Sequence, residues 1–372
     1  MPDADPINVV SKKVVVIAAG GTGGHLFPAA AFADELFRRG WRVMLMTDAR
    51  GRRYAEGFPA ERIIDVRAAS LTLNPITIVP NTLKIWRGVN EAKRHFSQLE
   101  PVLVAGFGGY PSFPALMAAR AFKVPILIHE QNSVLGRVNR AMATSAAIVA
   151  CGFERLERLP PKAQDRKRVV GNPVRSPILA VRERPYPEAP AGGRLNLLII
   201  GGSQGARLFG EVIPEAISLL PQPLRNRLDI VHQVREEQVA AAKKAYQKAK
   251  VNAEVAPFFT DMGQRLGAAH LVISRAGASS VTELQVAGRP AILVPFAAAA
   301  DDHQTANAES LTSVGAADLF TEEDFEPGPV AACLERRLAD PHGLAVRAAA
   351  ARAAAKPEAA KTLADLAESV VA

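Results

Sequence analysis

The sequence predicts an α/β protein made of two Rossmann-like units. Each unit opens with a short apolar run, typical of a buried strand, and a glycine-rich loop follows. Val14–Ala18 precedes the loop Gly20–Gly24, and Leu195–Ile200 precedes the loop Gly201–Gly210. Between the units, residues 182–194 contain three prolines and two glycines, which is the clearest break in composition and indicates part of a linker. The length of 372 residues also suits two ordinary domains better than one core.

The composition indicates a globular chain with an anionic partner. Apolar residues make up 48% and charged residues 22%, as in ordinary folded proteins. The net charge of +8 favours nucleic acid, an anionic membrane surface or a phosphorylated substrate, and composition does not choose among them. Cys151 and Cys333 are far apart, which argues against a disulfide framework or a zinc site and for packing roles in a reducing compartment.

The start of the chain superficially resembles a signal peptide. Lys12 and Lys13 precede the apolar run Val14–Ala19, but the run stops at Gly20 without a cleavage pattern, so a core strand is the better interpretation. No apolar stretch approaches the roughly 18 residues that a bilayer-spanning helix needs. We therefore expect a cytoplasmic protein whose membrane contact is peripheral.

Apolar runs and turn signals predict the remaining strands and helices. In the first unit the other strands are expected at Val43–Thr47, Val102–Ala105, Ile126–Ile128, Ala147–Ala150 and Arg168–Val170. In the second unit they are expected at Ile230–Gln233, just before Ala256–Met262, at Leu271–Ser274 and at Ala291–Val294. Helices are expected after the first glycine loop, over Arg235–Lys250 as a solvated helix, and from Pro357 onward with Leu363, Leu366 and Val370 on one face.

The first glycine loop predicts a phosphate site, because glycines permit positive φ and close backbone approach. His25 lies at the mouth of this loop, where it is either a hydrogen-bonded structural residue or a general base. Asp48, which follows the next strand, could bind a ribose, so a nicotinamide-binding function is an alternative. The dinucleotide fingerprint fails, however, where Leu26 occupies the position of its third glycine.

The stretch Leu271–Phe296 predicts a second ligand-binding turn. A buried strand, a turn of small residues and a helix start carrying Ser279 and Ser280 suit a diphosphate, because the first N–H groups of a helix are unpaired. The alternative is purely structural: Ser280 and Glu283 have the spacing of a capping box, in which Glu283 would only satisfy its own helix end.

A stripe of apolar residues with a basic rim begins near Leu71. Its apolar members fall at helical spacing at Ile76, Val79, Leu83 and Trp86. Basic residues lie close by at Lys84, Arg87, Lys93 and Arg94, and prolines interrupt the entry at Pro75 and Pro80. From these residues alone the stripe either packs into the core or forms an interfacial surface that dips into anionic lipid.

Seven motifs in a fixed order carry a family resemblance. They are GGTGGHLFP, GGYPS, HEQN, GNPVR, GGSQGA, SRAGASSVTEL and DDHQTANA, between Gly20 and Ala308. With them the chain resembles the MurG family of peptidoglycan N-acetylglucosaminyltransferases over nearly its whole length. The resemblance implies a glycosyltransferase-B fold, two Rossmann-like domains facing across a cleft, and inverting transfer of N-acetylglucosamine from UDP-GlcNAc to the 4-hydroxyl of the muramoyl sugar of lipid I, giving lipid II.

The resemblance also implies a domain division. Residues 1–174 would form the acceptor and membrane-facing domain, residues 175–355 the UDP-GlcNAc donor domain, and the final helix, 356–372, would pack back on the first domain. Donor contacts would come from the second domain and the residue before it, at Arg175, Ser203, Phe259, Ala278, Ser279, Ser280, Glu283 and Gln304. Glu283 would bind the ribose hydroxyls, the Phe259 backbone would hold the uracil, and the small residues at the helix start would hold the diphosphate.

On the other side of the cleft, the resemblance implies that Thr22, Gly23, Gly24 and Asn132 face the transferring sugar. His25, Tyr110 and Glu130 would lie on the acceptor side, with His25 as the base that removes the hydroxyl proton. The stripe at Ile76, Val79, Leu83 and Trp86 becomes a membrane patch, because a polyprenyl-linked acceptor stays in the bilayer. The enzyme would then be a peripheral protein at the cytoplasmic face of the bacterial inner membrane, serving cell wall synthesis and, through it, cell shape and division.

No cofactor or metal is expected. The only Asp-x-Asp spacing, Asp3 and Asp5, lies in the leader, so helix N-termini and Arg175 would stabilise the departing diphosphate. UDP-GlcNAc, lipid I and an anionic membrane are the expected partners, and nucleic acid is not. Three alternatives stay open: a UDP-GlcNAc 2-epimerase or another lipid glycosyltransferase of the same fold, a nicotinamide dehydrogenase, and a non-catalytic protein that binds UDP-sugars or polyanions.

Overall fold

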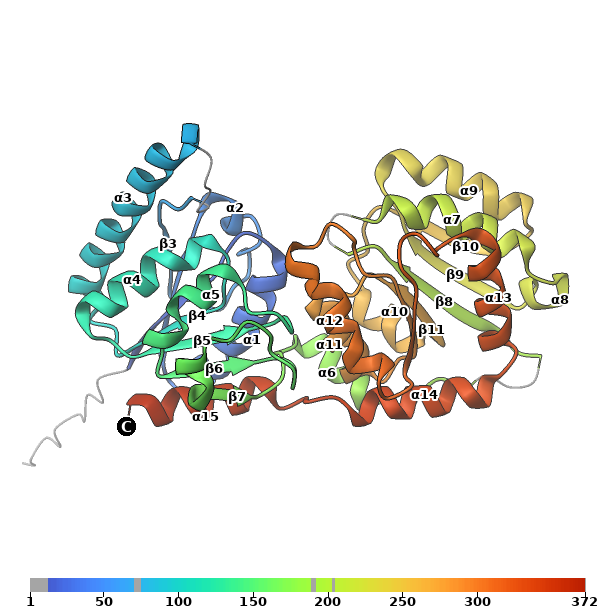
Figure 1. The fold of residues 1–372 in the computed structure, drawn as a ribbon. Helices are drawn as coiled ribbons and strands as arrows, with labels where there is room; N and C mark the ends of the chain where they lie inside the picture. Colours follow the sequence, from blue (N-terminus) through green and yellow to red (C-terminus); the bar gives the residue numbers. More distant parts are fainter. Residues whose placement is uncertain (1–12, 70–74, 189–191, 203–204, 372) are drawn as a thin grey trace, which may run out of the picture.

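The computed structural model describes residues 13–69, 75–188, 192–202 and 205–371. These residues form two α/β domains that lie side by side, with the C-terminal helices running beneath both (Figure 1). The two-unit architecture predicted from the glycine loops is therefore confirmed.

The N-terminal domain is built on a parallel sheet. Within the described residues its seven strands have the order β3-β2-β1-β4-β5-β6-β7. Their bounds are β1 Val14–Ala18, β2 Arg42–Thr47, β3 Arg62–Asp65, β4 Leu103–Gly106, β5 Ile126–Glu130, β6 Ile148–Cys151 and β7 Lys167–Val169. The strand order reverses between β1 and β4, and ligands of such sheets bind at the carboxyl ends beside that reversal.

Helices cover both faces of this sheet. Their bounds are α1 Gly23–Arg38, α2 Ala49–Arg52, α3 Pro75–Leu99, α4 Phe113–Phe122 and α5 Arg137–Met142, with short 3₁₀ turns at Tyr110–Ser112, Ala143–Ser145 and Pro161–Arg166. Side chains of α3 and α4 share one apolar core with β1, while α1 and the last helix of the chain share the other.

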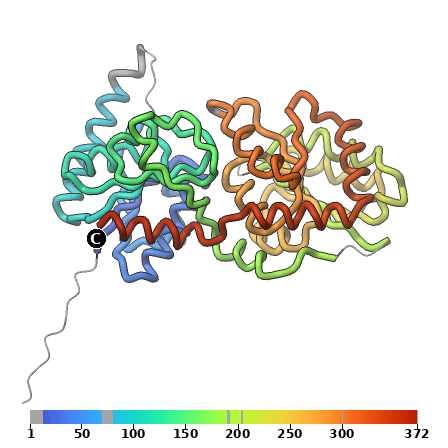
Figure 2. Tube along the Cα trace, turned by 60° about the horizontal axis from the view of Figure 1, so that its bottom comes forward, coloured from blue at the N-terminus to red at the C-terminus, as the bar shows by residue number. Residues whose placement is uncertain are grey.

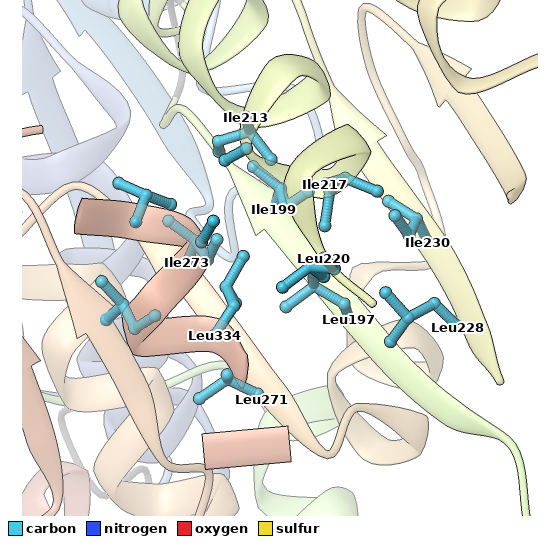
Figure 3. Packing of buried hydrophobic residues seen from close by; sticks show 14 of the residues in the cluster. Leu197, Ile199, Ile213, Ile217, Leu220, Leu228, Ile230, Leu271, Ile273 and Leu334 are labelled. Carbon is cyan, nitrogen blue, oxygen red and sulfur yellow. The ribbon is translucent and has the colours of Figure 1, made fainter. Parts of the chain in front are cut away.

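The C-terminal domain repeats the plan. Among the described residues, six parallel strands have the order β10-β9-β8-β11-β12-β13, which reverses between β8 and β11. Their bounds are β8 Leu195–Ile200, β9 Leu228–Gln233, β10 Asn252–Ala256, β11 Leu271–Ser274, β12 Ala291–Leu293 and β13 Ala317–Leu319. Figure 3 shows how Leu197 and Ile199 of β8 pack against Ile213 and Ile217 to build one of its two cores.

The helices of this domain again lie on both faces. Their bounds are α6 Ser176–Arg182, α7 Arg207–Leu219, α8 Gln222–Arg225, α9 Val239–Lys248, α10 Met262–Ala268, α11 Ala278–Ala287, α12 His303–Thr312, α13 Pro327–Leu338 and α14 Pro341–Ala353, with 3₁₀ turns at Glu236–Gln238 and Ala300–Asp302. The helix α6 packs against α10 and α11, so the chain has already entered the second domain before β8 begins.

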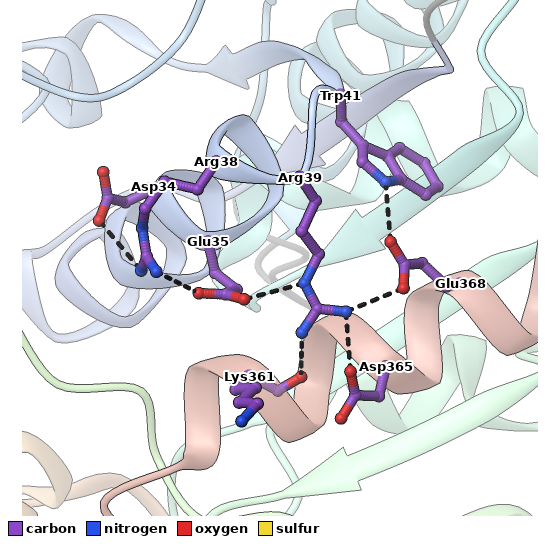
Figure 4. Close-up of polar contacts among 8 residues, drawn as sticks. All are labelled: Asp34, Glu35, Arg38, Arg39, Trp41, Lys361, Asp365 and Glu368. Atoms are coloured by element: carbon purple, nitrogen blue, oxygen red, sulfur yellow. Dashed lines mark hydrogen bonds and ion pairs between the residues drawn. The ribbon is translucent and has the colours of Figure 1, made fainter.

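The chain then crosses back. Figure 2 shows α14 lying along the C-terminal domain and α15, Ala359–Val371, continuing under the N-terminal one. Leu363 is buried in the core beside α1. Arg39 at the end of α1 binds Asp365 at 2.7 Å and Glu368 at 2.8 Å (Figure 4). The chain thus joins the two domains at two places, once before α6 and once before α15.

Most predicted strands agree with the structure to within two residues at either end. Three local expectations were wrong. Pro80 lies inside α3 and does not interrupt it, α15 begins two residues after Pro357, and the helix expected over 235–250 opens as a 3₁₀ turn before α9 starts at Val239. Cys151 and Cys333 are both free and buried, as expected for packing residues.

Candidate functional site

The carboxyl ends of the central strands of both sheets face a common region. On the N-terminal side the loops after β1 and β4 touch, since a Cβ placed on Gly109 would lie 2.6 Å from the Gly20 carbonyl oxygen. On the C-terminal side are the turn between β11 and α11 and the start of α12. Helices α1 and α11 contact each other, and a pocket between them is lined by Phe27, Pro28, Asn172, Pro173, Val174, Arg175, Ser279, Thr282 and Glu283.

The start of α11 is open for an anion. Gly277 is its N-cap residue and contributes no side chain, so the first N–H groups of the helix point out of its end without a side-chain cap. The Ser279 hydroxyl is buried and, within the described part of the chain, has no hydrogen-bond partner. A helix N-terminus with an unpaired hydroxyl beside it suits phosphate oxygens.

The capping-box interpretation of this helix is wrong. Because α11 begins at Ala278, Ser280 lies inside the first turn and Glu283 in the second, so Ser280 is not the N-cap residue. The Glu283 carboxylate instead accepts a hydrogen bond from the Arg175 guanidinium at 3.1 Å. Its side chain is 18% exposed, and burial raises the pKa of Glu283 while the Arg175 charge opposes that rise.

Arg175 connects the two domains. Its guanidinium lies 4.5 Å from the centre of the Phe27 ring on α1 while it pairs with Glu283 on α11. A cation held in this way faces the pocket from its rim, with 41% of its side chain exposed. It can therefore reach an anion that enters the pocket.

Two further residues expected on the donor side, Gln304 and Phe259, have the following surroundings. The Gln304 side-chain oxygen accepts the Phe296 N–H at 2.9 Å, which leaves its amide nitrogen to donate elsewhere. Phe259 is buried just beyond β10 with the Arg265 guanidinium 4.1 Å from its ring centre, whereas neighbouring Phe258 is 70% exposed. Ser203 lies outside the described residues.

His25 is held by the loop that precedes α1. Its Nδ1 is 3.0 Å from the Gly20 carbonyl oxygen, so the Nδ1–H donates there and Nε2 keeps its lone pair. Desolvation lowers the pKa of His25, and His303 of the other domain adds to the decrease, while Glu130 and the Gly20 carbonyl oppose it. The imidazole is therefore neutral near pH 7. Thr22, Gly23 and Gly24 form the uncapped start of α1 immediately before it.

Glu130 is a structural carboxylate. It is 2% exposed. Oε1 accepts from the Asn132 backbone and side-chain N–H groups, and Oε2 accepts from the Gly136 backbone and the Asn139 side chain, each at 2.9 to 3.2 Å. With four donors around it, Glu130 orients the loop that carries Asn132 and acts on His25 through its charge.

Tyr110 forms a small polar cluster beside the β4 loop. Its hydroxyl donates to Asp48 at 3.0 Å, and the Arg50 guanidinium both bonds that hydroxyl and lies over the ring. The other Asp48 oxygen accepts the Gly51 N–H at the start of α2. Asp48 is thus engaged locally, which removes the reason for a ribose-binding role and for the nicotinamide alternative.

The apolar stripe on α3 is exposed where its side chains are described. Leu83 is 45% and Trp86 62% exposed, while Ala92 and Phe96 on the other face are buried. Trp86 borders a surface groove that is also lined by Arg67, Arg87, Asn90, Glu91, Lys93, Arg94, Ser97 and Phe122. Core packing is therefore wrong for Leu83 and Trp86. The side chains of Ile76 and Val79 lie outside the described part of the structure.

Neither a metal-binding cluster nor a membrane-spanning helix is present among the described residues. They contain no cluster of three or more His, Cys, Asp or Glu side chains arranged to hold a metal ion, and Asp3 and Asp5 lie outside them. Likewise, none of the helices in the described ranges combines the length and apolar character needed to cross a bilayer.

Sequence reasoning missed the amide side chains that join the domains. Asn307 on α12 bonds to Asn132 and Ser133 of the N-terminal domain, and Asn172 bonds both to the Gln131 carbonyl and to Thr282 on α11. Both asparagines lie inside quoted motifs, but no local pattern reveals a partner that is more than 100 residues away.

Comparison with known proteins identifies the family. The model of the glycosyltransferase family 28 N-terminal domain matches residues 15–151, and that of the family 28 C-terminal domain matches residues 196–363. A protein of Maricaulis maris named UDP-N-acetylglucosamine--N-acetylmuramyl-(pentapeptide) pyrophosphoryl-undecaprenol N-acetylglucosamine transferase is 50% identical over 97% of this chain and 99% of its own. The chain belongs to the MurG family of glycosyltransferases.

Solved structures agree with this family and with its fold. The crystal structure of Acinetobacter baumannii MurG is similar with a TM-score of 0.78 and 33% identity, covering 96% of this chain and 99% of that one. A UDP-GlcNAc 2-epimerase from Neisseria meningitidis has a TM-score of 0.66 at 14% identity over 95% and 98% of the two chains. That likeness extends to the fold alone. The glycosyltransferase-B fold that the family resemblance implied for this chain is confirmed.

Proposed function

We propose that this enzyme transfers N-acetylglucosamine from UDP-GlcNAc to the 4-hydroxyl of the muramoyl sugar of lipid I, with inversion at the anomeric carbon, and so makes lipid II. The observation that carries the proposal is 50% identity over nearly the full length to a transferase named for this reaction. Site geometry supports it, because the helix whose first turn carries His25 in one domain contacts the helix α11, whose start has no side-chain cap, in the other.

The donor binds to the C-terminal domain in this proposal. The diphosphate lies at the start of α11 against Ala278, Ser279 and Ser280. There the backbone N–H groups have no side-chain cap, and the Ser279 hydroxyl has no hydrogen-bond partner among the described residues. Glu283 accepts hydrogen bonds from the ribose hydroxyls. The Phe259 backbone holds the uracil, and Gln304 donates its amide N–H groups to the sugar. Ser203 adds a phosphate contact.

Arg175 and the helix start stabilise the leaving group. As the glycosidic bond breaks, negative charge grows on the UDP diphosphate, and preorganised donors at the α11 start can each contribute on the order of 3 kcal/mol. Arg175 is within reach of that charge because it already lies at the rim of the pocket. These groups perform the role that a metal ion has in many other glycosyltransferases.

His25 removes the proton of the attacking hydroxyl. Its Nε2 lone pair is available while Nδ1 is held by Gly20, and its lowered pKa keeps it neutral near pH 7. Thr22, Gly23, Gly24 and Asn132 face the transferring sugar. Tyr110 lies on the acceptor side, and Glu130 contributes there through the loop that it orients.

The N-terminal domain also meets the membrane in this proposal. Leu83 and Trp86 extend from α3 beside basic side chains, and Ile76 and Val79 continue the stripe in the sequence. Such a surface holds the enzyme at the cytoplasmic face of the inner membrane, where a polyprenyl-linked acceptor resides. We divide the chain after Val174 into this acceptor domain and the donor domain, with residues 356–372 returning to the first.

The test is sugar transfer from labelled UDP-GlcNAc to a water-soluble lipid I analogue, measured with a chelator present. Formation of the disaccharide product is expected, and the chelator is expected to leave the rate unchanged. Release of UDP with conversion to the 2-epimer would instead support the epimerase alternative. Protection by UDP against thermal unfolding without any turnover would contradict the acceptor assignment and favour a binding protein.

A further inference from the structure

Helix α12 meets the N-terminal domain through one fully buried amide. Asn307 is 0% exposed. Its Oδ1 accepts the Ser133 N–H at 2.8 Å, and its Nδ2 donates to the Asn132 Oδ1 at 3.1 Å and to the Ala276 carbonyl at 3.2 Å. A single side chain therefore joins its own helix to two segments of the site, the loop after β5 and the turn before α11.

These contacts converge on the transfer chemistry. Asn132 is held from one side by Asn307 and from the other by Glu130, so the buried amide sets the position of the Asn132 side chain. Three residues before Asn307, Gln304 lies in the first turn of the same helix. The position of α12 relative to the N-terminal domain thus determines where Gln304 lies relative to His25.

Two ion pairs at or near α12 also reach the N-terminal domain, and they are more exposed than the buried amide. Arg155 pairs with Glu309, and Arg158 pairs with Asp301 at 2.6 Å just before the helix. Three of these four side chains are 44 to 57% exposed, so water and salt screen both pairs. The buried amide is different, because breaking it leaves the Ser133 N–H without its acceptor in a site where that serine is 1% exposed.

We propose that Asn307 is a positioning residue for sugar transfer: it fixes α12 and Asn132 against each other across the cleft, and so aligns the donor sugar with the base of the opposite domain. The inference rests on the proposed function. UDP itself should bind without this contact, because the expected UDP contacts lie in the C-terminal domain and at Arg175.

The experiment compares Asn307→Ala and Asn307→Asp with Ser310→Ala as the matched control. Ser310 is one turn further along the same helix, and its hydroxyl donates to the Asn307 backbone carbonyl, so the control perturbs α12 without touching the other domain. Aspartate keeps one oxygen as the acceptor for the Ser133 N–H, but its second carboxylate oxygen replaces Nδ2 and faces the oxygens of Asn132 and Ala276 without a hydrogen to donate.

For both Asn307 variants we expect kcat with the lipid I analogue to fall about 10- to 100-fold, with the Kd of UDP within about twofold of the parent. Exchange of the Ser133 amide hydrogen should accelerate in Asn307→Ala and stay slow in Ser310→Ala. Equal kcat in all variants would overturn the proposal, and so would a parent-like Asn307→Asp. A parallel loss of UDP affinity would make Asn307 a structural residue of the donor domain.

The same experiment separates the two claims. Parent enzyme that fails to transfer sugar contradicts the proposed function. Ser133 exchange that does not change in Asn307→Ala contradicts the positioning role, whichever reaction the enzyme catalyses.

Discussion

The two domains carry the same local structure with different chemistry. In each, a central parallel strand ends in a small-residue turn and an uncapped helix: β1 leads to α1, and β11 leads to α11. The first turn of α1 carries His25, while α11 carries Ser279 and, one turn later, Glu283. The backbone therefore supplies a helix start suited to an anion twice, and in the proposed function a few side chains give one start to proton removal and the other to nucleotide binding.

Burial favours the uncharged form of both ionisable side chains, and their charged neighbours make the difference. At α1, desolvation favours the neutral imidazole, which is the form that a base needs. At α11, the neighbouring Arg175 opposes the effect of burial on Glu283 and helps to keep it a carboxylate, the form that accepts hydrogen bonds from sugar hydroxyls. The two similar turns therefore differ in the charged neighbour of their ionisable group, which favours the charged form only at Glu283. The following predictions test that division of roles.

The largest expected effect is on catalysis at α1. His25→Ala should lower kcat by about 10²- to 10⁴-fold because the transition state loses its base. The Kd of UDP, measured by calorimetry, should stay within about twofold, since α11 is untouched. If the affinity for UDP falls as much as kcat does, His25 is a structural residue and the proposed division of roles between α1 and α11 is wrong.

The converse change at α11 should act on binding. Glu283→Ala removes an ionised hydrogen-bond acceptor, and hydrogen bonds to charged groups contribute about 1.5 to 3 kcal/mol, so the Kd of UDP should rise about 10- to 150-fold. The Arg175 charge loses its partner as well, so thermal unfolding must be followed in parallel. If Kd is unchanged and only kcat falls, the assignment of the ribose to Glu283 is wrong.

The membrane surface should belong to the N-terminal domain alone. Trp86→Glu replaces an exposed ring beside a basic groove with a negative charge, and binding to anionic vesicles should weaken about tenfold. Phe37→Glu is the matched control, because Phe37 is 59% exposed on α1, and α1 covers the opposite face of the sheet from α3. The free energy of unfolding should change by less than about 0.5 kcal/mol in both variants. Equal vesicle binding by the two would contradict the patch.

The smallest expected effect is on the pH profile. Because the pKa of His25 is lowered below the ordinary 6.5, its neutral form persists as pH falls and is lost only when pH passes the lowered value. The acid limb of kcat/KM should therefore have its midpoint below 6.5, and activity at pH 6.5 should remain above half of its plateau. A midpoint above 6.5 would mean that Glu130 outweighs burial at this histidine.

Much of the molecule follows from short-range sequence patterns. Strand, glycine loop and helix follow each other closely along the chain, so periodicity and glycine positions predict the two units and nearly all of their strands. The exposed stripe on α3 was ambiguous, because helical spacing cannot tell which face a neighbouring helix covers. Only the packing of Ala92 and Phe96 toward the core leaves Leu83 and Trp86 outside.

What the sequence by itself determined is the pair of βα units, the anion-friendly turns and, through seven ordered motifs, the family. Tertiary structure alone decided the rest. It paired Glu283 with Arg175 instead of with its own helix end, surrounded Glu130 with four donors, and placed Asn307 against a loop some 170 residues earlier in the chain. The physical reason is that hydrogen bonds and electrostatic interactions depend on distance in space and not on separation along the chain. Asn307 and Glu283 have partners more than 100 residues away in the chain, and the donors around Glu130 reach it only through the fold of one loop. No local pattern encodes which residues the packing of two domains brings together.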